Sequence, residues 1–372
     1  MGFKLWVSMG EIRPQVIKVK PGKRAQEAVN AAIEILRSGG LILLPTETVY
    51  GVAADPRVPG AEERLYEAKS RDRGKPIPLM ASSLEAVERA GAVLSPEARR
   101  LARRFWPGPL TIVLPCGSGT EGFRVPNHAL ALAVLNAAGG LLRVTSANRS
   151  GEPSARTVEA ALAALGSRVA VALDDGPALF GLESTVVDAT RDKLVILRQG
   201  ALLAETVLSR PKVWFVCTGN TCRSPMAEHL LRRWLGPDTG WEVASAGVAA
   251  LDGQSASEGA ARVMVEKKID LALHRSRLLA EAHIDDADLV VVMTEAHKQA
   301  VLRRFPRAEH RIVLLNSFSH VYPGEDVPDP FGLPLDVYRK IRDEIDAAMP
   351  DLVLYLHGLY KSNTRIELQE GF

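Results

Sequence analysis

Apolar and polar residues follow one another in two different ways along the chain. In the first 210 residues, short apolar runs are separated by long polar stretches. Between Arg24 and Arg37 apolar side chains recur every three or four positions, and Gly39-Gly40 follow, which predicts an amphipathic helix that ends at the glycines. We expect further helices near 61–70, 84–90 and 96–105, and strands near 41–44, 110–114, 141–145, 185–188 and 194–197. This part is therefore predicted to be a mixed α/β domain built on a twisted sheet.

From Val213 onward the pattern becomes regular. Strands are expected near 213–216, 242–245, 289–293 and 312–315, and helices near 226–235, 257–268, 296–305 and 335–356. Because strands and helices alternate, we expect a doubly wound domain with a four-stranded parallel sheet. A join near Pro211 gives two predicted domains, 12–208 and 211–360.

Charge supports the same division. The formal net charge of the 372 residues is 46 − 44 = +2. Residues 1–210 contribute 27 − 21 = +6 and residues 211–372 contribute 19 − 23 = −4, so the near-neutral total is a cancellation. Three cysteines are too few for a disulfide framework, and no apolar stretch is long enough to span a membrane. We therefore expect a cytoplasmic protein with no membrane partner.

The second part begins with a cysteine loop. The strand expected at 213–216 leads into Cys217-Thr-Gly-Asn-Thr-Cys-Arg223-Ser224, and Pro225 follows in the first turn of a helix, with Ser224 as its expected N-cap. Backbone N–H groups of such a loop form an anion cradle at a helix N-terminus. That positive field should lower the pKa of Cys217 and make its thiolate nucleophilic, while Arg223 can hold two phosphoryl oxygens. The spacing predicts a phosphate-binding nucleophile.

A displacement at phosphorus also needs a proton donor for the leaving group. Asp329 lies between two prolines in Val327-Pro-Asp-Pro-Phe-Gly332, a composition that is also ordinary for a solvated turn.

Together, VCTGNTCRSPMAE, Ser245-Ala-Gly247, HRSR, ADLVVVMT and DPFG resemble the low-molecular-weight protein-tyrosine-phosphatase family over residues 213–357. The resemblance implies Cys217 as nucleophile, Arg223 as phosphate ligand and Asp329 as general acid and then base, with no cofactor. It also implies that Ser224 bonds the thiolate and that Asn220 shapes the loop. Cys222 would be a backup thiol that forms a reversible disulfide with Cys217 on oxidation.

The subtype depends on Thr221, where tyrosine-specific members carry a bulky aliphatic residue. Threonine there, with DPF in place of DPY, resembles the bacterial protein-arginine-phosphatase branch. The expected substrate is therefore a phosphorylated protein or small molecule, with phosphoarginine and phosphotyrosine both open. An arsenate reductase that borrows an external thiol remains an alternative; one with its own thiol relay is excluded, because no cysteine follows Cys222.

A glycine pattern in the first part is misleading. Gly117-Ser-Gly-Thr-Glu-Gly122 matches a dinucleotide-binding loop, but the extended sequence that follows opens no helix, so this interpretation fails. Polar groups instead gather near strand ends, where α/β sheets place ligands. Four cations also lie within residues 69–75. Alone, these features predict only a site for an anionic ligand such as a nucleotide.

As a set, PTETVYG, KSRDRGKP, FWPGPLTIVL, RVPNH, TSANRSG and GLESTVVD resemble the YrdC/YciO family of threonylcarbamoyl-AMP synthases over residues 24–202. The implied reaction joins L-threonine, bicarbonate and ATP into threonylcarbamoyl-AMP and pyrophosphate, which feeds the modification of adenosine in tRNA by a downstream transferase. Threonine would be held by Thr46, Arg124, Ser146 and Ser184. ATP, with Mg²⁺, would be held by Lys69, Arg71, Lys75, Asn148 and Arg198. Two positions depart from the family pattern. Met80 lies near a position where members often carry a histidine, and Arg156 stands where a small hydroxyl residue is usual.

The two resemblances predict a bifunctional enzyme. One alternative makes the first part a non-catalytic RNA-binding module, which its basic excess permits, although no aromatic stacking string is present. Another makes the phosphatase part regulatory or degenerate, against which Cys217, Arg223 and Asp329 are all present.

Overall fold

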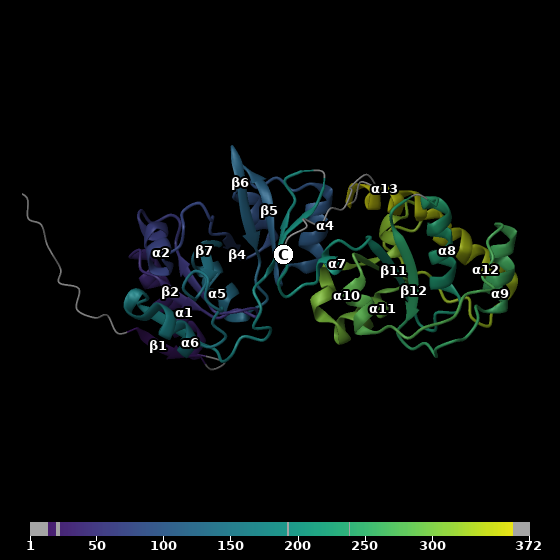
Figure 1. Ribbon diagram of the computed structural model, residues 1–372. Helices are drawn as coiled ribbons and strands as arrows, with labels where there is room; N and C mark the ends of the chain where they lie inside the picture. Colours follow the sequence, from purple (N-terminus) through teal and green to yellow (C-terminus); the bar gives the residue numbers. More distant parts are fainter. Residues whose placement is uncertain (1–13, 20–22, 192, 238, 360–372) are drawn as a thin grey trace, which may run out of the picture. The chain divides into compact units, whose positions relative to one another are not determined.

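The computed structural model describes residues 14–19, 23–191, 193–237 and 239–359. These residues form two compact units, the first comprising 14–98 and 105–207 and the second 99–104 and 208–359. The outer bounds 12 and 360 of the predicted domains lie outside the described residues. Each unit has its own sheet and its own core, and each is described separately below (Figure 1).

The first unit is built on a ten-stranded mixed sheet of order β1-β8-β2-β3-β7-β4-β6-β5-β9-β10. Its strands are β1 (Gln15–Lys18), β2 (Ile42–Leu44), β3 (Gly51–Ala54), β4 (Leu79–Ala81), β5 (Leu110–Cys116), β6 (Gly119–Arg124), β7 (Leu141–Ser146), β8 (Val171–Asp174), β9 (Thr185–Asp188) and β10 (Val195–Arg198). Its helices are α1 (Lys23–Arg37), α2 (Ala61–Lys69), α3 (Leu84–Arg89), α5 (Ala129–Ala137), α6 (Val158–Leu165) and α7 (Ala204–Val207), with a 3₁₀ turn at Gly166–Arg168; α4 (Pro96–Phe105) has residues in both units.

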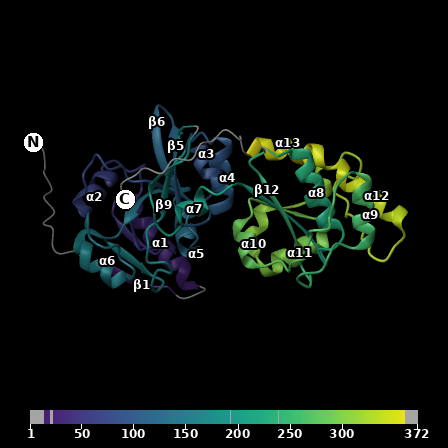
Figure 2. The same ribbon diagram turned by 45° about the vertical axis from the view of Figure 1, so that its right-hand side comes forward.

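Alternation along β2 explains how this sheet is covered. Ile42 and Leu44 belong to a core with α1 and α5, whereas Leu43 belongs to a second core with α2 and α6. Successive side chains of a strand point to opposite faces, so a strand that is apolar throughout needs helices on both sides. Figures 1 and 2 show α1 and α5 together and α2 apart from them.

The second unit has a four-stranded parallel sheet of order β12-β11-β13-β14. Its strands are β11 (Lys212–Cys217), β12 (Glu242–Gly247), β13 (Leu289–Val292) and β14 (Ile312–Leu314). Its helices are α8 (Arg223–Leu235), α9 (Glu258–Glu266), α10 (Glu281–Asp286), α11 (Glu295–Arg304), α12 (Leu335–Ala347) and α13 (Met349–Leu359), with 3₁₀ turns at Pro306–Arg311 and Leu315–Phe318.

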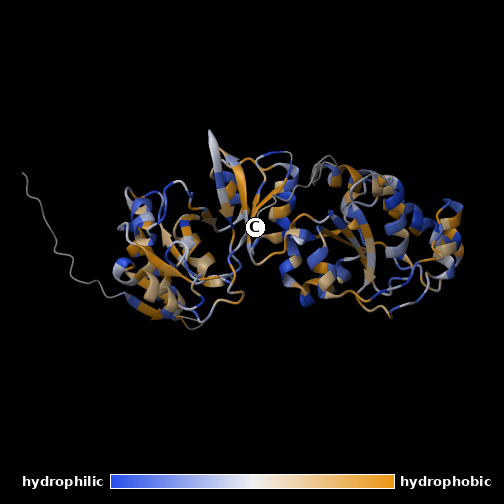
Figure 3. Cartoon of the chain, in the orientation of Figure 1, coloured by the Kyte–Doolittle hydropathy of each residue, from blue (hydrophilic) through white to orange (hydrophobic). Residues whose placement is uncertain are grey.

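This sheet is covered on both faces, as the sequence predicts for a doubly wound domain. Val213 and Phe215 of β11 pack with α8, α9, α12 and α13, while Trp214 and Val216 pack with α10 and α11. Figure 1 shows α8, α9 and α12 on one side of β11 and α10 and α11 on the other. Figure 3 shows hydrophobic strands in both units, with helices that carry both kinds of residue.

Among the elements that the sequence predicts, two details differ in the structure. The helix expected over 335–356 is two helices, α12 and α13, because Pro350 lies in the first turn of α13, where its missing N–H is tolerated. The expected N-cap Ser224 instead lies inside α8, whose N-cap position is Cys222. No helix among the described residues combines the length and apolar character needed to cross a membrane.

Candidate active sites

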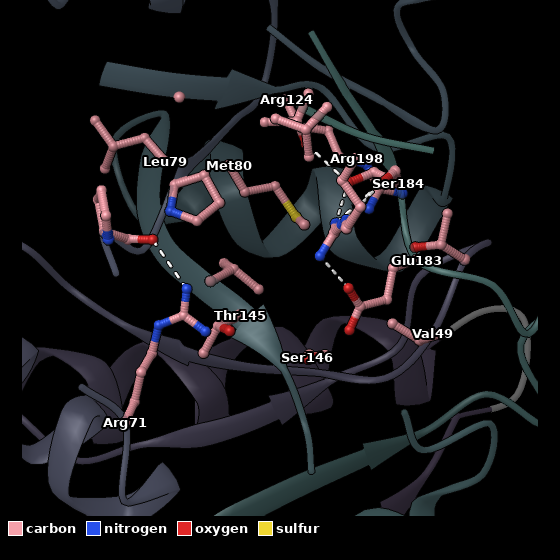
Figure 4. A pocket seen from close by; sticks show the side chains of 18 of the residues that line it. Val49, Arg71, Leu79, Met80, Arg124, Thr145, Ser146, Glu183, Ser184 and Arg198 are labelled. Atoms are coloured by element: carbon pink, nitrogen blue, oxygen red, sulfur yellow. Dashed lines mark hydrogen bonds and ion pairs between the residues drawn. The ribbon is translucent and has the colours of Figure 1, made fainter. Parts of the chain in front are cut away.

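A cavity of about 530 Å³ lies within the first unit, where several strands end. Thr46 follows β2, Arg124 ends β6, Ser146 ends β7, and Arg198 ends β10. Figure 4 shows Arg71, Arg124, Glu183 and Arg198 around this space. The strand order brings together residues more than 150 positions apart in the sequence.

Lys69 is the most buried cation of the cavity, with a relative exposure of 1%. Its ammonium group donates to Asn148 Oδ1 at 3.0 Å and Ser146 Oγ at 3.2 Å, and also to the Ser146 carbonyl. Burial and the nearby charge of Arg71 lower the pKa of Lys69 to about 8, although Glu183 acts in the opposite direction. Lys69 therefore titrates close to the physiological range.

Glu183 places a carboxylate beside Arg198 in this cavity. Arg198 Nη1 forms an ion pair with Glu183 (Figure 4), and Ser154 Oγ donates to Glu183 Oε1 at 2.6 Å. Burial by itself raises the pKa of Glu183, but Arg198, Ser154, Ser146 and Lys69 outweigh that effect, and the pKa lies below its usual value.

Arg124 retains a buried donor atom. Its Nε donates to the Gly108 carbonyl at 3.1 Å, and its Nη2 lies 2.8 Å from Glu47 Oε1. This ion pair lacks hydrogen-bond geometry, so Nη2 and both Glu47 oxygens have no hydrogen-bond partner among the described residues. A carboxylate ligand that enters the cavity could satisfy Nη2.

The cavity gathers most of the residues that the sequence singled out. Eight of the nine line it: Thr46, Lys69, Arg71, Arg124, Ser146, Asn148, Ser184 and Arg198. Lys75 does not line it and is exposed, so its role as an ATP ligand stays a prediction. Of the two departures, Met80 lines the cavity, whereas the side chain of Arg156 lies against Gly181.

Sequence reasoning missed Glu183 and Thr111. Glu183 directly precedes Ser184 in the GLEST string, which was the available signal. Thr111 lies 2.8 Å from Ser184, Oγ1 to Oγ, through pairing of β5 with β9, a contact that no local pattern reveals. The misleading glycine pattern forms the turn of the β5–β6 hairpin and the start of β6, and its Glu121 and Gly122 line the cavity.

In the second unit, β11 ends at Cys217 and the chain turns directly into α8. The loop carbonyls are bound from outside: those of Cys217 and Thr218 accept from the N–H groups of Val248 and Ala249, and that of Thr221 from Ser257. Because N–H and C=O point in opposite directions in a peptide unit, the N–H groups of this loop face the other side. The loop thus has the geometry of an anion cradle.

Asn220 holds the shape of the loop. It is fully buried, with a left-handed φ of 54°, a conformation that asparagine tolerates better than most residues. Its Nδ2 donates to Ser224 Oγ at 3.0 Å and Ser245 Oγ at 2.8 Å, and its Oδ1 accepts from the Arg277 N–H at 2.9 Å. Its carbonyl lies 2.7 Å from His274 Nε2.

Cys217 is buried beside Ser224, with 3.0 Å between Sγ and Oγ. Burial raises the pKa of the thiol, and the Ser224 hydroxyl and N–H, Arg223 and the Asn220 N–H only partly oppose this. The lowered pKa expected from the sequence is therefore wrong for the ligand-free protein. Complete desolvation of Sγ is the main reason, and the charge of Arg223 is itself partly neutralised by Asp329.

Arg223 joins the loop to the predicted acid. Its Nη2 lies 2.6 Å from Asp329 Oδ2, and its Nη1 donates to the Val327 carbonyl at 3.1 Å. The structure thus brings Cys217, Arg223 and Asp329 together across more than 100 residues of sequence.

One further residue of this site, His297, was missed by sequence reasoning. His297 on α11 places Nε2 2.9 Å from Thr218 Oγ1 and Nδ1 2.8 Å from Thr294 Oγ1. Thr218 in turn accepts from Arg223 Nη2 at 3.4 Å. His297 follows the MT end of a matched string, but nothing in its spacing indicates a contact 79 residues away.

Cys222 is buried in the same core as Cys217. Its Sγ is 3.1 Å from Ser257 Oγ, and Thr221 Oγ1 lies 3.6 Å from the same sulfur. Cys116, Cys217 and Cys222 are all free thiols in this structure, so a disulfide between Cys217 and Cys222 stays a prediction.

A cysteine in an anion-binding loop, with an arginine and an aspartate beside it, defines a thiol-dependent phosphatase site, and the cavity of the first unit defines a site for an anionic small molecule. The chain belongs to two families, one in each part. Residues 34–200 match the Sua5/YciO/YrdC family, described as "Telomere recombination", and residues 212–363 match the low molecular weight phosphotyrosine protein phosphatase family.

Curated relatives match one part or the other. The Protein-arginine-phosphatase of Geobacillus stearothermophilus is 47% identical over 141 residues, 38% of this chain and 93% of the relative. The Threonylcarbamoyl-AMP synthase of Thiobacillus denitrificans is 36% identical over 170 residues, 43% of this chain and 90% of the relative. The synthase of Bacillus subtilis is 35% identical over 187 residues, 47% of this chain, but the chain spans only 54% of that relative.

Among solved structures, a variant of Sua5 from P. abyssi matches 81% of this chain and 98% of its own at 23% identity, with a TM-score of 0.50, a likeness of fold. The arginine phosphatase YwlE from G. stearothermophilus matches 40% of this chain and 93% of its own at 46% identity, with a TM-score of 0.37.

Proposed function

We propose that the first unit joins L-threonine, bicarbonate and ATP into threonylcarbamoyl-AMP with release of pyrophosphate. The single observation that carries this proposal is the cavity that Lys69, Arg71, Arg124 and Arg198 line together with the hydroxyl residues Thr46, Ser146 and Ser184. Family membership and the activity named for the B. subtilis and T. denitrificans relatives support it. The product would be passed to a transferase that modifies tRNA.

The two substrates divide the cavity by charge. Arg124 Nη2 is a buried donor suited to the threonine carboxylate, beside Ser184 and Thr46. Lys69, Arg71 and Arg198 supply cations for the phosphates of ATP, and Asn148 fixes the position of Lys69. Catalysis would consist of positioning and stabilising charge, without a protein nucleophile.

Mg²⁺ would enter with the nucleotide. Among the described residues no group of three His, Cys, Asp or Glu side chains could hold a metal ion alone. Mg²⁺ on nucleotides is typically bound by phosphate oxygens, water and one or two carboxylates. Glu183, a carboxylate among the cavity cations, is the side chain suited to that role.

The test of the first proposal is pyrophosphate release by the purified chain. Release should require ATP, L-threonine and bicarbonate together, and omission of any one should abolish it. Arg71→Ala should weaken ATP binding. If the chain binds RNA, releases no pyrophosphate, and retains RNA binding in Arg71→Ala, the alternative of a non-catalytic RNA-binding module is correct instead.

For the second unit we propose a cysteine-dependent phosphatase. The observation that carries this proposal is the position of Cys217 in a loop that also holds Arg223, whose Nη2 lies 2.6 Å from Asp329 Oδ2. The proton of the Cys217 thiol passes to the Asp329 carboxylate, and the thiolate attacks phosphorus. The bond to the leaving oxygen or nitrogen breaks as Asp329 donates that proton to it. Asp329, now ionised, accepts a proton from water, whose oxygen attacks the cysteinyl phosphate and releases phosphate and the thiolate.

Cys217→Ser should abolish phosphate release; a mutant that still hydrolyses a phospho-substrate would overturn this proposal.

The substrate is proposed to be phosphoarginine or phosphotyrosine on a protein. The relative at 47% identity is named as an arginine phosphatase, and Thr221 forms part of the loop wall with its hydroxyl 3.6 Å from Cys222. The test compares both phospho-amino acids on the wild type and on Thr221→Ile. A polar wall should favour phosphoarginine, and the substitution should shift preference toward phosphotyrosine. Arsenate reduction with an added thiol, in the absence of phosphate release, would favour the reductase alternative.

A further inference from the structure

The phosphatase loop carries a hydroxyl group that the proposed chemistry leaves without a role. Thr218 directly follows Cys217, and its side chain is exposed at the rim of the loop. Its Oγ1 accepts a hydrogen bond from Arg223 Nη2 at 3.4 Å, the same atom that holds the carboxylate of Asp329 at 2.6 Å. Thr218 Oγ1 therefore lies next to the position that the Asp329 carboxylate occupies on Arg223 in this structure.

The direction of hydrogen bonding at Thr218 depends on His297. His297 is buried, and its two ring nitrogens contact two hydroxyl groups, Thr218 on one side and Thr294 on the other. Burial and the charge of Arg223 lower the pKa of His297 to about 4, so near neutral pH the ring carries a single N–H.

Thr294 decides which nitrogen carries that hydrogen. It is the N-cap of α11, and its Oγ1 already accepts from the His297 backbone N–H at 3.1 Å. Its own hydroxyl hydrogen has one acceptor in reach within the described residues, His297 Nδ1 at 2.8 Å. With Nδ1 as acceptor, the ring hydrogen lies on Nε2 and is donated to Thr218.

The consequence falls on Thr218. Both of its neighbours, His297 Nε2 and the guanidinium of Arg223, are then donors, and both use its oxygen as acceptor. The hydroxyl hydrogen of Thr218 is therefore not used by either neighbour, and it can be donated to an acceptor beside Arg223, where the Asp329 carboxylate lies in this structure.

We propose that Thr218 donates a hydrogen bond to a phosphoryl oxygen of the substrate, and that Thr294 and His297 are positioning residues that hold Thr218 in this donor role. The proposal rests on the phosphatase activity proposed above and adds a side-chain ligand to its backbone N–H groups and Arg223. A hydrogen bond to a charged oxygen stabilises by about 1.5–3 kcal/mol, which corresponds to about 10- to 100-fold in affinity.

The first test measures phosphate affinity and turnover in the full chain. Thr218→Val keeps the shape of the side chain and removes the hydroxyl, and should weaken binding of inorganic phosphate and reduce kcat/KM by about 10-fold or more. Thr218→Ser, the matched control, should restore most of both. A Thr218→Val protein within twofold of wild type in both measurements would overturn the proposal. Because Thr218 is exposed, these variants should fold, and thermal unfolding checks that they do.

The second test asks whether His297 acts through Thr218. His297→Phe should weaken phosphate binding about 3- to 10-fold, but adding it to Thr218→Val should cause no further loss, since the group it orients is gone. Multiplied losses in a folded double variant would contradict the positioning role.

The third test reads the ring directly. ¹⁵N shifts of labelled histidine should show His297 protonated at Nε2 and not at Nδ1, and Thr294→Val should disturb this preference while Thr294→Ser keeps it. Protonation at Nδ1 in the wild type would overturn the proposal. Neither this measurement nor phosphate binding needs turnover. If the chain releases no phosphate, the proposed activity is wrong. The phosphate-binding and ¹⁵N measurements still test the donor role of Thr218 separately.

Discussion

At the scale of single residues, the chemistry of both sites depends on charges that are buried before any ligand arrives. Lys69 and Cys217 illustrate this in opposite ways. Burial lowers the pKa of the lysine and raises that of the thiol, so in each case burial shifts the equilibrium toward the neutral form, although Lys69 stays charged below about pH 8. The sequence identifies both residues by type and spacing, but the strength of desolvation depends on packing and cannot be predicted from a motif.

The pKa of Lys69, about 8, predicts how ATP binding depends on pH. Phosphate oxygens favour the ammonium form, which is present below about pH 8 and is lost as the pH rises through that value. ATP affinity should therefore be nearly constant below pH 8 and fall above it, by up to about tenfold per pH unit. Calorimetry at pH 8 in two buffers of different ionisation enthalpy should show uptake of about half a proton on binding.

Lys69→Met is the control for this pH dependence. It should bind ATP weakly at every pH and take up no proton. A wild-type affinity that stays flat through pH 8 and above would show that Lys69 does not contact the phosphates.

At the scale of elements, a motif works only when neighbouring strands and helices support it. The sequence predicts most strands and helices of the second unit because apolar runs separated by helical stretches are a strong signal. It misses α10 and the break before α13. In the first unit it misses the helices α5, α6 and α7 and the strands β1, β3, β4, β6 and β8, and all of these strands except β6 are only three or four residues long. Such short strands are stabilised by their neighbours in the sheet, which local sequence does not reveal.

Gly247, the last residue of β12, tests this support for the cysteine loop. A Cβ atom there would lie 2.3 Å from the Thr218 carbonyl oxygen and 2.9 Å from the Asn220 nitrogen, so the loop would have to move. Gly247→Ala should therefore lower phosphatase kcat/KM by at least about tenfold and destabilise the unit by about 1–3 kcal/mol, measured by kinetics and urea unfolding.

Gly358→Ala is the matched control, because no atom lies within 4 Å of a Cβ built there. Within α13 the change should leave activity intact and stabilise by about 0.5–1 kcal/mol. Full activity in Gly247→Ala would mean that the approach of β12 to the loop is not needed.

At the scale of the whole molecule, the chain carries two sites, each complete within its own unit. The charge asymmetry read from the sequence fits this arrangement. The cavity of the first unit uses several cations, whereas the loop of the second uses one arginine and backbone N–H groups. The two site types could be predicted because each depends on strings with fixed spacing; Glu183, Thr111 and His297 could not, because their contacts arise only from the fold.

Independence of the two sites predicts a reciprocal pattern of losses. Cys217→Ser should abolish phosphatase turnover and leave pyrophosphate release unchanged, and Lys69→Met should do the reverse, because neither residue lines the other site. Both activities are measured on the same full-length preparations. If either change abolished both activities in a protein that unfolds normally, the sites would be coupled.

The ion pair between Arg223 and Asp329 has a consequence for how the phosphatase meets its substrate. Asp329, the proposed general acid, is paired with the guanidinium of Arg223, which must bind the phosphoryl group of the substrate. In the free enzyme Asp329 therefore competes with the substrate for Arg223. Asp329→Asn should remove this ion pair, so the variant should bind inorganic phosphate several-fold more tightly while its turnover falls about 100-fold. Asp326→Asn, which removes a nearby charge but not the ion pair, should have a smaller effect on phosphate binding. The incoming phosphoryl group thus frees the Asp329 carboxylate from Arg223, and the carboxylate can then take up the proton that it passes to the leaving group.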